Sequence, residues 1–214
     1  REPRFYASIN FPGQVWKHGH ELAFLYEGVE GKKDAGSDYC KTGYLMGKIN
    51  NIDITSNPGK TEKTFWIYFR LGEIYLNCAE ALNEYAGPTK LDDDGHDAYY
   101  YVNAIRNRAG LPDLPEGLSK EQMRDRIKHE RRIELAFETH RFFDVRRWKD
   151  AELSESKAIH SLNIYAGTSK QDDAFYARTL CEQRIFVAPQ HYFFPIEQDE
   201  IDKNRDGLLQ NPGW

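Results

Sequence analysis

The segment KHERRIELAFETHRFFDVRRW, from Lys128 to Trp148, constrains the fold more than any other part of the sequence. It places ten charged residues and seven large apolar ones within twenty-one positions. It contains neither glycine nor proline, so the sequence predicts one continuous helix here. A helix of this composition must bury its apolar face and must also find partners for its charges.

Four charged residues of this segment recur at steps of four, four and three, which places them on one stripe of a helix: Glu130, Glu134, Glu138 and Arg141. Three carboxylates in one column repel one another unless cations lie between them. Arg131 stands three residues before Glu134, and Asp144 is spaced to pair with Arg147. We expect a partly buried Arg–Glu lattice that joins this helix to its neighbours. The residues assigned to this structural role are Glu130, Arg131, Glu134, Glu138, Arg141, Asp144 and Trp148.

Other roles for the charged stripe fit less well. Glu134 and Glu138 could act as a general acid and base, but carboxylates on adjacent turns point the same way, whereas glycosidases flank a bond from two sides. A di-iron site needs a glutamate three residues before a histidine, and Phe137 holds that position before His140. Residues 120–150 carry ten basic and seven acidic side chains, and the whole chain has a net charge of -5. This balance argues against a nucleic-acid partner, because such binding depends on neutralising phosphates.

The chain divides into three stretches of different character. Residues 1–64 are rich in glycine, asparagine, aspartate, serine and proline, which predicts a loop-rich segment. Residues 65–150 have helical periodicity and form the expected helical core. Residues 151–214 read as loops and a C-terminal turn segment, with one short helical piece at Gln198–Asn204. Short strands are expected in the first stretch at Arg4–Asn10, Leu22–Tyr26 and Tyr44–Ile49.

Three helices are predicted within the core. The first ends at Gly87-Pro88 and presents one apolar face, formed by Leu71, Ile74, Tyr75, Cys78, Ala79 and Leu82. Asp97 is the expected N-cap of the second, which ends before Gly110. Ser119 and Gln122 fit a capping box that opens the third.

The first helix carries part of a repeat pattern. Tyr68-x-x-Leu71-Gly72-x-x-Tyr75 matches part of the tetratricopeptide helix signature, and the small Gly72 would let a neighbouring helix approach closely. A single copy does not support a solenoid of identical repeats. We therefore expect an all-α fold of tetratricopeptide-like helix pairs, with long loop-rich insertions and a few short strands.

Ligand-binding candidates lie in the loop-rich segment. An aromatic side chain on a loop can stack on the C–H face of a sugar, and neighbouring polar groups can then fix the hydroxyls. The candidates for carbohydrate binding are Trp16, His18, Tyr26 and Tyr39. The alternative for each aromatic is that it folds back over a small local core.

No metal site and no cofactor are expected. His18-Gly19-His20 with Glu21 is better read as a surface loop, because two histidines one residue apart diverge in a strand. The run DDDGHD at residues 92–97 lacks the spacing of an EF-hand and reads as a polar turn. The three cysteines form no C-x-x-C pair, which argues against a zinc site.

Five stretches, taken together, resemble one family, the SusD/RagB family. RLGEIYLNCAEALNE resembles its RLAEVYLNYAEA helix, AYYYVNAIRNRAGLP its ALNAIRARAGLP helix, and the segment from Lys128 to Trp148 its IxxERRxELAFEGxRxxDLRRW helix. The ending FFPIEQDEIDKNRDGLLQNPGW and the opening EPRFYASI are similar to the corresponding family segments. Two mild departures are Thr139 where the family has glycine and Trp214 where it ends in tyrosine.

The resemblance implies a fold and a function. Such proteins are all-α, with tetratricopeptide-like helix pairs and loop insertions. They are lipid-anchored proteins on the surface of the Gram-negative outer membrane, where they bind glycans or other nutrients without enzymatic activity and cap a TonB-dependent transporter. This chain would then be the C-terminal portion, with the lipidated N-terminal part absent. The alternatives are a glycoside-processing enzyme and a purely helical scaffold for protein interactions.

Overall fold

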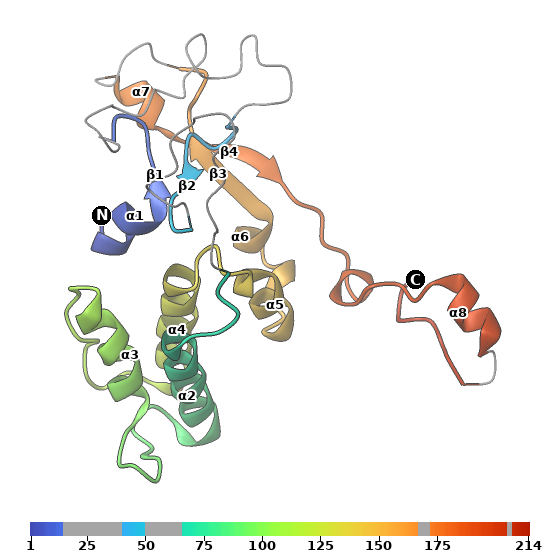
Figure 1. The fold of residues 1–214 in the computed structure, drawn as a ribbon, viewed down its shortest axis with the longest axis horizontal. Helices are drawn as coiled ribbons and strands as arrows, with labels where there is room; N and C mark the ends of the chain where they lie inside the picture. Colours follow the sequence, from blue (N-terminus) through green and yellow to red (C-terminus); the bar gives the residue numbers. More distant parts are fainter. Residues whose placement is uncertain (15–39, 50–65, 167–171, 205–206) are drawn as a thin grey trace. The chain divides into compact units, whose positions relative to one another are not determined.

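The computed structural model of the 214-residue chain describes residues 1–14, 40–49, 66–166, 172–204 and 207–214 (Figure 1). Helices dominate the described residues, and the strands form two small two-stranded sheets. This is the helix-dominated fold with a few short strands that the sequence predicts. The expected strand at Leu22–Tyr26 lies outside the described residues.

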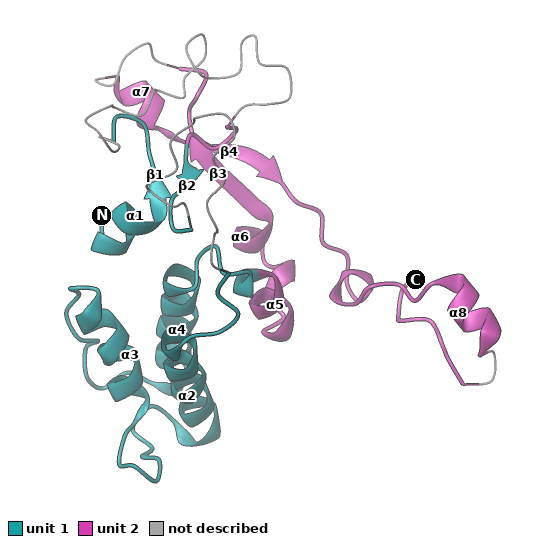
Figure 2. Cartoon of the chain, in the orientation of Figure 1, with its two compact units in different colours: residues 1–23, 44–141 teal, residues 24–43, 142–214 magenta. Residues whose placement is uncertain are grey.

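The chain folds as two compact units (Figure 2). Unit 1 comprises Arg1–Ala23 and Tyr44–Arg141, and unit 2 comprises Phe24–Gly43 and Phe142–Trp214. The three core helices lie in unit 1, and the longer of the two sheets lies in unit 2.

Three helices build the core of unit 1: α2 (Leu71–Ala86), α3 (Ala98–Arg108) and α4 (Lys120–Glu134). Helix α2 packs against both others. The buried apolar side chains at these helices form two clusters. The larger contains Ala79, Ala98, Tyr101, Val102, Leu114, Met123 and Ile127, and the smaller contains Leu76, Ile105 and Leu135.

The predicted helix caps are confirmed. The Asp97 carboxylate accepts from the Tyr100 backbone N–H at the start of α3. Ser119 and Gln122 form both halves of the capping box of α4. These caps were predictable because they depend on residues three positions apart.

The buried face of α2 agrees with the predicted one only in part. Leu76, Ala79 and Asn83 are fully buried, whereas Leu71 and Ile74 are 64% and 45% exposed. Of the predicted face, Ala79 belongs to the core cluster and Tyr75, Cys78 and Leu82 pack against it, so the prediction fails only at Leu71 and Ile74. Periodicity alone does not say how far a neighbouring helix covers an apolar face.

The prediction of one continuous helix from Lys128 to Trp148 is wrong. Helix α4 ends at Glu134, and α5 (His140–Arg147) begins after a turn. Within the turn, Phe137 and Thr139 adopt left-handed backbone angles, with φ of 67° and 68°. The Glu138 N–H donates to the Leu135 carbonyl instead of the Glu134 carbonyl that a continuing helix would use.

Two cationic side chains from distant parts of the sequence donate hydrogen bonds to the Glu134 carbonyl, which has no helical partner. Lys48 Nζ and Arg70 Nη2 donate to the Glu134 backbone oxygen at 2.5 and 2.7 Å. The same two side chains bind the Glu138 carboxylate, Lys48 Nζ to Oε1 at 2.5 Å and Arg70 Nε to Oε2 at 2.7 Å. At the end of α4, charge-assisted bonds from Lys48 and Arg70 thus replace one helical hydrogen bond. No local sequence pattern reveals these bonds.

Glu130, Glu134 and Glu138 are 1%, 2% and 4% exposed, and each pairs with cations from other parts of unit 1. Their partners are Arg4 and Arg106 on Glu130, Arg4, Arg70 and Arg108 on Glu134, and Arg70 and Lys48 on Glu138. We call these eight residues the carboxylate lattice.

The cations of the lattice come from distant segments, whereas the sequence pointed to Arg131 as a neighbour of Glu134 on the same helix. Arg131 is itself buried, and it donates to the Asn77 Oδ1 of α2 at 2.6 Å. Gly72 leaves space for a cation rather than for a helix, because a Cβ there would lie 2.5 Å from Arg70 Nη1.

The N-terminal segment forms a short helix rather than the predicted strand. Helix α1 (Pro3–Ser8) is followed by strand β1 (Ile9–Asn10), which pairs antiparallel with β2 (Leu45–Met46). Pro3 favours a helical start because its fixed φ suits the first turn. The helix directs Arg4 into the carboxylate lattice.

Unit 2 contains a sheet that the sequence analysis missed. Strands β3 (Ala158–Leu162) and β4 (Arg178–Gln183) pair antiparallel with an irregularity between Ile159 and His160. Its short helices are η3 (Asp150–Glu152), α6 (Ser154–Lys157), α7 (Asp173–Tyr176), η4 (Gln190–Tyr192) and α8 (Gln198–Lys203). Helix α8 confirms the predicted helical piece near the C-terminus.

The left-handed turn generates a first prediction. Replacing Thr139 by glycine should raise the free energy of unfolding by roughly 1 kcal/mol, because a β-branched residue is disfavoured at this φ and glycine is not. The lost hydrogen bond from Thr139 Oγ1 to the Glu138 carbonyl limits the gain. Urea denaturation would measure it. Thr139→Ser keeps the hydroxyl without relieving the backbone and should give no gain; an equal gain in both variants would contradict the explanation.

The carboxylate lattice generates a second prediction. Burial alone would raise the pKa of the Glu134 and Glu138 carboxyls, but hydrogen bonds from Arg70, Arg4 and Lys48 outweigh it and lower both pKa values below the ordinary 4.5. A carboxyl with a lowered folded-state pKa stabilises the fold above its unfolded pKa, and this stability is lost as pH falls through the folded value. The free energy of unfolding should therefore decline below about pH 4.5.

Glu134→Gln should cost about 3 kcal/mol at pH 7, because it leaves buried cations without their carboxylate, and its stability should decline less steeply on acidification. Urea denaturation between pH 3 and 7 would compare it with Glu116→Gln, which changes an exposed glutamate outside the lattice. Equal pH dependence in the two variants would rule out the lattice as the source.

Candidate functional site

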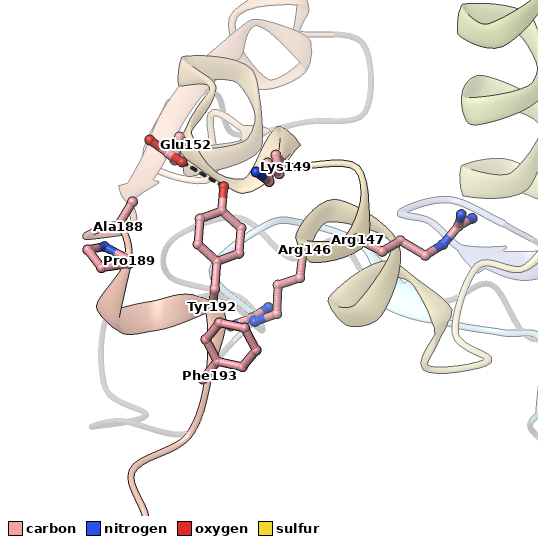
Figure 3. A pocket seen from close by; sticks show the side chains of 8 residues that line it. All are labelled: Arg146, Arg147, Lys149, Glu152, Ala188, Pro189, Tyr192 and Phe193. Atoms are coloured by element: carbon pink, nitrogen blue, oxygen red, sulfur yellow. Dashed lines mark hydrogen bonds between the residues drawn. The ribbon is translucent and has the colours of Figure 1, made fainter. Parts of the chain in front are cut away.

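The candidate site is a pocket of about 660 Å³ in unit 2 (Figure 3). The end of α5 and helix η3 supply one part of its lining, and the segment around η4 supplies the other. The residues that line it are Arg146, Arg147, Lys149, Glu152, Ala188, Pro189, Tyr192 and Phe193.

Tyr192 and Glu152 connect the two parts of the lining. The Tyr192 hydroxyl donates to Glu152 Oε1 at 2.7 Å, the dashed bond of Figure 3. Partial burial and this hydrogen bond raise the pKa of Tyr192 to about 12. The phenol therefore stays protonated at neutral pH, and the Glu152 side chain that accepts its proton is exposed.

Arg146 is fixed in place beside Phe193. Its guanidinium carbon lies 3.5 Å from the centroid of the Phe142 ring, in a cation–π contact. Nη1 donates to the Phe142 carbonyl at 3.0 Å, and Nε donates to the His191 carbonyl at 3.3 Å. Burial lowers the pKa of this guanidinium, which nonetheless stays charged at neutral pH. A cation held from several sides is preorganised to meet a ligand oxygen.

A second pocket of about 340 Å³ adjoins the first and shares Arg146, Arg147, Tyr192 and Phe193 with it. It adds Phe142, Phe143, His191 and Phe194 to the lining. Phe142 and Phe194 are stacked, with ring centroids 6.0 Å apart and planes 15° from parallel. Phe143, Phe193 and Phe194 are 63%, 56% and 73% exposed, so their rings are open to a ligand.

The C-terminus holds the aromatic segment in position. Trp214 Nε1 contacts the carbonyls of Gln190 at 2.9 Å and of Phe193 at 3.1 Å. Asn211 Nδ2 donates to the Phe194 carbonyl at 2.7 Å. These bonds restrict the backbone beneath the exposed rings.

The structural candidates Asp144 and Trp148 both contact Arg147. Arg147 lines the pocket, and in Figure 3 its side chain extends away from Tyr192 and Glu152. Its Nη2 lies 2.9 Å from Asp144 Oδ1, and its guanidinium carbon lies 4.5 Å from the Trp148 ring. Arg141 also makes contacts, in the turn of α5 that precedes Asp144.

The sequence candidates for carbohydrate binding, Trp16, His18, Tyr26 and Tyr39, lie outside the described residues. The pocket residues were missed, although the aromatic pairs Phe142-Phe143 and Phe193-Phe194 offered a signal. Adjacent aromatics in a helical pattern read first as core, and only the structure shows that they are exposed.

The polar turn at residues 92–97 is satisfied internally. The Asp92 carboxylate accepts from the N–H groups of Asp94 and His96 and from the Tyr101 hydroxyl at 3.0, 2.9 and 2.5 Å. The Tyr101 bond is the main reason why the pKa of Asp92 is lowered. Among the described residues, no group of three or more histidine, cysteine, aspartate or glutamate side chains is placed to hold a metal ion.

The pocket has the chemistry to bind a sugar. Exposed rings can cover the apolar face of a pyranose, while Arg146, Lys149 and Glu152 can meet its hydroxyls. Glycoside hydrolysis requires two opposed carboxyl groups. Glu152 is the sole carboxylate among the described residues that line the two pockets.

No helix in the described part of the chain is both long and apolar enough to cross a membrane.

Comparison with known proteins gives a consistent result. The profile of the SusD family matches residues 1–214. The SusD-like protein P2 of Formosa agariphila is 30% identical over 168 residues, which are 75% of this chain and 28% of that protein.

Two solved structures from Bacteroides fragilis are similar. A SusD-like protein is 36% identical with a TM-score of 0.79, and the match covers 100% of this chain and 39% of that one. A SusD-like carbohydrate-binding protein is 25% identical with a TM-score of 0.69, covering 94% of this chain and 40% of that one. The chain thus spans less than half the length of these relatives.

Proposed function

The chain belongs to the SusD family, and from that premise we propose that it binds glycans at the surface of the outer membrane without cleaving them. The observation that carries the proposal is the match of the family profile to the whole chain, together with a similar fold in a carbohydrate-binding relative. We further propose that the bound glycan passes to a TonB-dependent transporter and that a lipid anchor outside residues 1–214 holds the protein at the membrane.

The proposed glycan site is the pair of adjoining pockets in unit 2. Together they form a groove with exposed rings at Phe143, Phe193 and Phe194 and with fixed polar groups at Arg146 and Glu152. Such a groove suits several sugar units in a row, because each ring offers a separate stacking face. A protein that hands its ligand on needs reversible binding, which shallow stacking with few hydrogen bonds provides.

Binding and catalysis can be separated in one experiment. The protein would be mixed with a panel of neutral and acidic polysaccharides, and tryptophan fluorescence and new reducing ends would be followed in the same samples. Trp214 is a suitable reporter because its indole contacts the Phe193 carbonyl. We expect a saturable fluorescence change without new reducing ends. New reducing ends would show a glycoside-processing enzyme. No change in fluorescence and no new reducing ends would favour a scaffold.

The location of the site is tested by Phe193→Ala. Loss of an exposed stacking ring should weaken binding roughly tenfold, which corresponds to about 1.4 kcal/mol. Isothermal titration calorimetry with the polysaccharide identified above would measure it. Tyr6→Ala is the matched control, since Tyr6 is an exposed aromatic of unit 1 with 54% exposure against 56% for Phe193. Saturable binding that Phe193→Ala leaves unchanged would place the glycan elsewhere.

A further inference from the structure

The two pockets of the proposed groove carry an excess of positive charge. Arg146, Arg147 and Lys149 line the larger pocket together with a single carboxylate, Glu152. Arg146 and Arg147 also line the smaller pocket, which receives no carboxylate from the described part of the chain. The whole chain has a net charge of -5, so this group of cations is a local feature that the overall composition does not explain.

One of the three cations is already neutralised within the protein. Arg147 Nε donates to Asp144 Oδ1 at 2.9 Å, and Arg147 Nη2 lies 2.9 Å from the same oxygen. Asp144 is buried, so this ion pair belongs to the fold and leaves little charge for a ligand. Arg146 and Lys149 are therefore the two cations that a ligand can meet.

Arg146 is a partly desolvated cation that pairs with no carboxylate of the described residues. Its Nε and Nη1 donate to backbone carbonyls, and its guanidinium lies over the Phe142 ring. Burial lowers the pKa of this guanidinium, which means that its surroundings favour the charged form less than water does. An anion placed against Nη2 would supply the charge-assisted hydrogen bonds that burial has removed.

Lys149 adds a second cation next to Arg146. Its backbone N–H donates to the Arg146 carbonyl at 3.0 Å, in a turn where Lys149 has a left-handed φ of 60°. Its side chain is exposed, and none of the carboxylates in the described part of the chain pairs with it. A lysine side chain is flexible and its ammonium is a compact charge, so it can follow a ligand oxygen that the fixed guanidinium cannot reach.

The histidine of the smaller pocket also offers a donor. His191 Nδ1 accepts from the Val187 N–H at 3.0 Å, so the neutral ring carries its proton on Nε2. The groove therefore presents guanidinium, ammonium and imidazole donors, whereas its one carboxylate already accepts from the Tyr192 hydroxyl. Ionised carboxylate and sulfate groups are acceptors without donors, and they match this surplus of donors.

We propose that the groove binds acidic glycans, with a uronate carboxylate or a sulfate ester against Arg146 and with Lys149 as the second cation. The inference rests on the proposed glycan binding and adds the class of glycan. A planar guanidinium suits either anion, because two of its N–H groups can meet two ligand oxygens. A neutral glycan would cover Arg146 without pairing its charge and should therefore bind less tightly.

The test uses ligands that differ in charge alone. The protein would first be titrated with polysaccharides that carry uronates, polysaccharides that carry sulfate esters, and neutral ones. The tightest acidic ligand would then be neutralised, a uronate by methyl esterification and a sulfate by chemical desulfation, and isothermal titration calorimetry would compare the two forms. We expect neutralisation to weaken binding at least tenfold. Raising NaCl from about 50 to about 500 mM should reduce this difference, because salt screens the attraction.

The outcomes of this comparison separate the two proposals. A uronate or a sulfate ligand that loses affinity on neutralisation identifies which anion the groove takes. If neutral polysaccharides bind as tightly as acidic ones, the protein binds glycans but the inferred preference for acidic ones is overturned. If no polysaccharide binds, glycan binding and the preference both fail.

A charge variant locates the anion. Lys149→Gln should weaken binding of the acidic ligand roughly fivefold and leave binding of its neutralised form unchanged. Lys90→Gln is the matched control, since Lys90 is an exposed lysine of unit 1, and it should bind both forms as the unaltered protein does. Equal affinity of the two variants for the acidic ligand would overturn the assignment of the anion to this groove.

Discussion

The buried carboxylates Glu130, Glu134 and Glu138 are the constraint on which unit 1 depends. A buried charge is tolerated only when it is paired and hydrogen-bonded, so each carboxylate requires cations to be brought to it. Arg4, Lys48, Arg70, Arg106 and Arg108 meet this requirement from positions scattered over the first half of the chain. Ion pairs of this kind add little net stability beyond apolar packing, but they penalise any arrangement that leaves a charge alone. The lattice therefore specifies which segments meet the helix, in a unit whose apolar clusters lie mainly among three helices.

The same constraint explains where sequence reasoning succeeds and fails. The caps at Asp97 and Ser119 were predictable because each is decided by neighbours within one helical turn. The end of α4 was not predictable, because Lys48 and Arg70, which are far away in the sequence, donate to the Glu134 carbonyl. A segment without glycine or proline carries no local stop signal, and the left-handed angles at Phe137 and Thr139 occur beside these tertiary bonds.

The groove that we propose as the glycan site lay beyond prediction for a related reason. It joins Glu152 to Tyr192 across 40 residues, and the missed strands β3 and β4 occupy the chain between them. The aromatic pairs at 142–143 and 193–194 are visible in the sequence, yet nothing local shows whether such rings face a core or solvent. The resemblance to a family predicted the fold class because it compares several segments in order. It did not identify the groove, because the groove is defined by side chains rather than by helix order.

The carboxylate lattice and the groove share no residue, and they place different demands on their cations. In the lattice, the arginines form ion pairs with carboxylates. The side chain of each of these glutamates is 2% exposed. In the groove, Arg146 is fixed by an aromatic ring and by backbone carbonyls, none of which neutralises its charge. A cation held by neutral groups keeps its attraction for ligand oxygens, whereas one paired with a buried carboxylate does not. The cations that pair with the buried carboxylates of unit 1 are thus different residues from the cation in the proposed groove of unit 2.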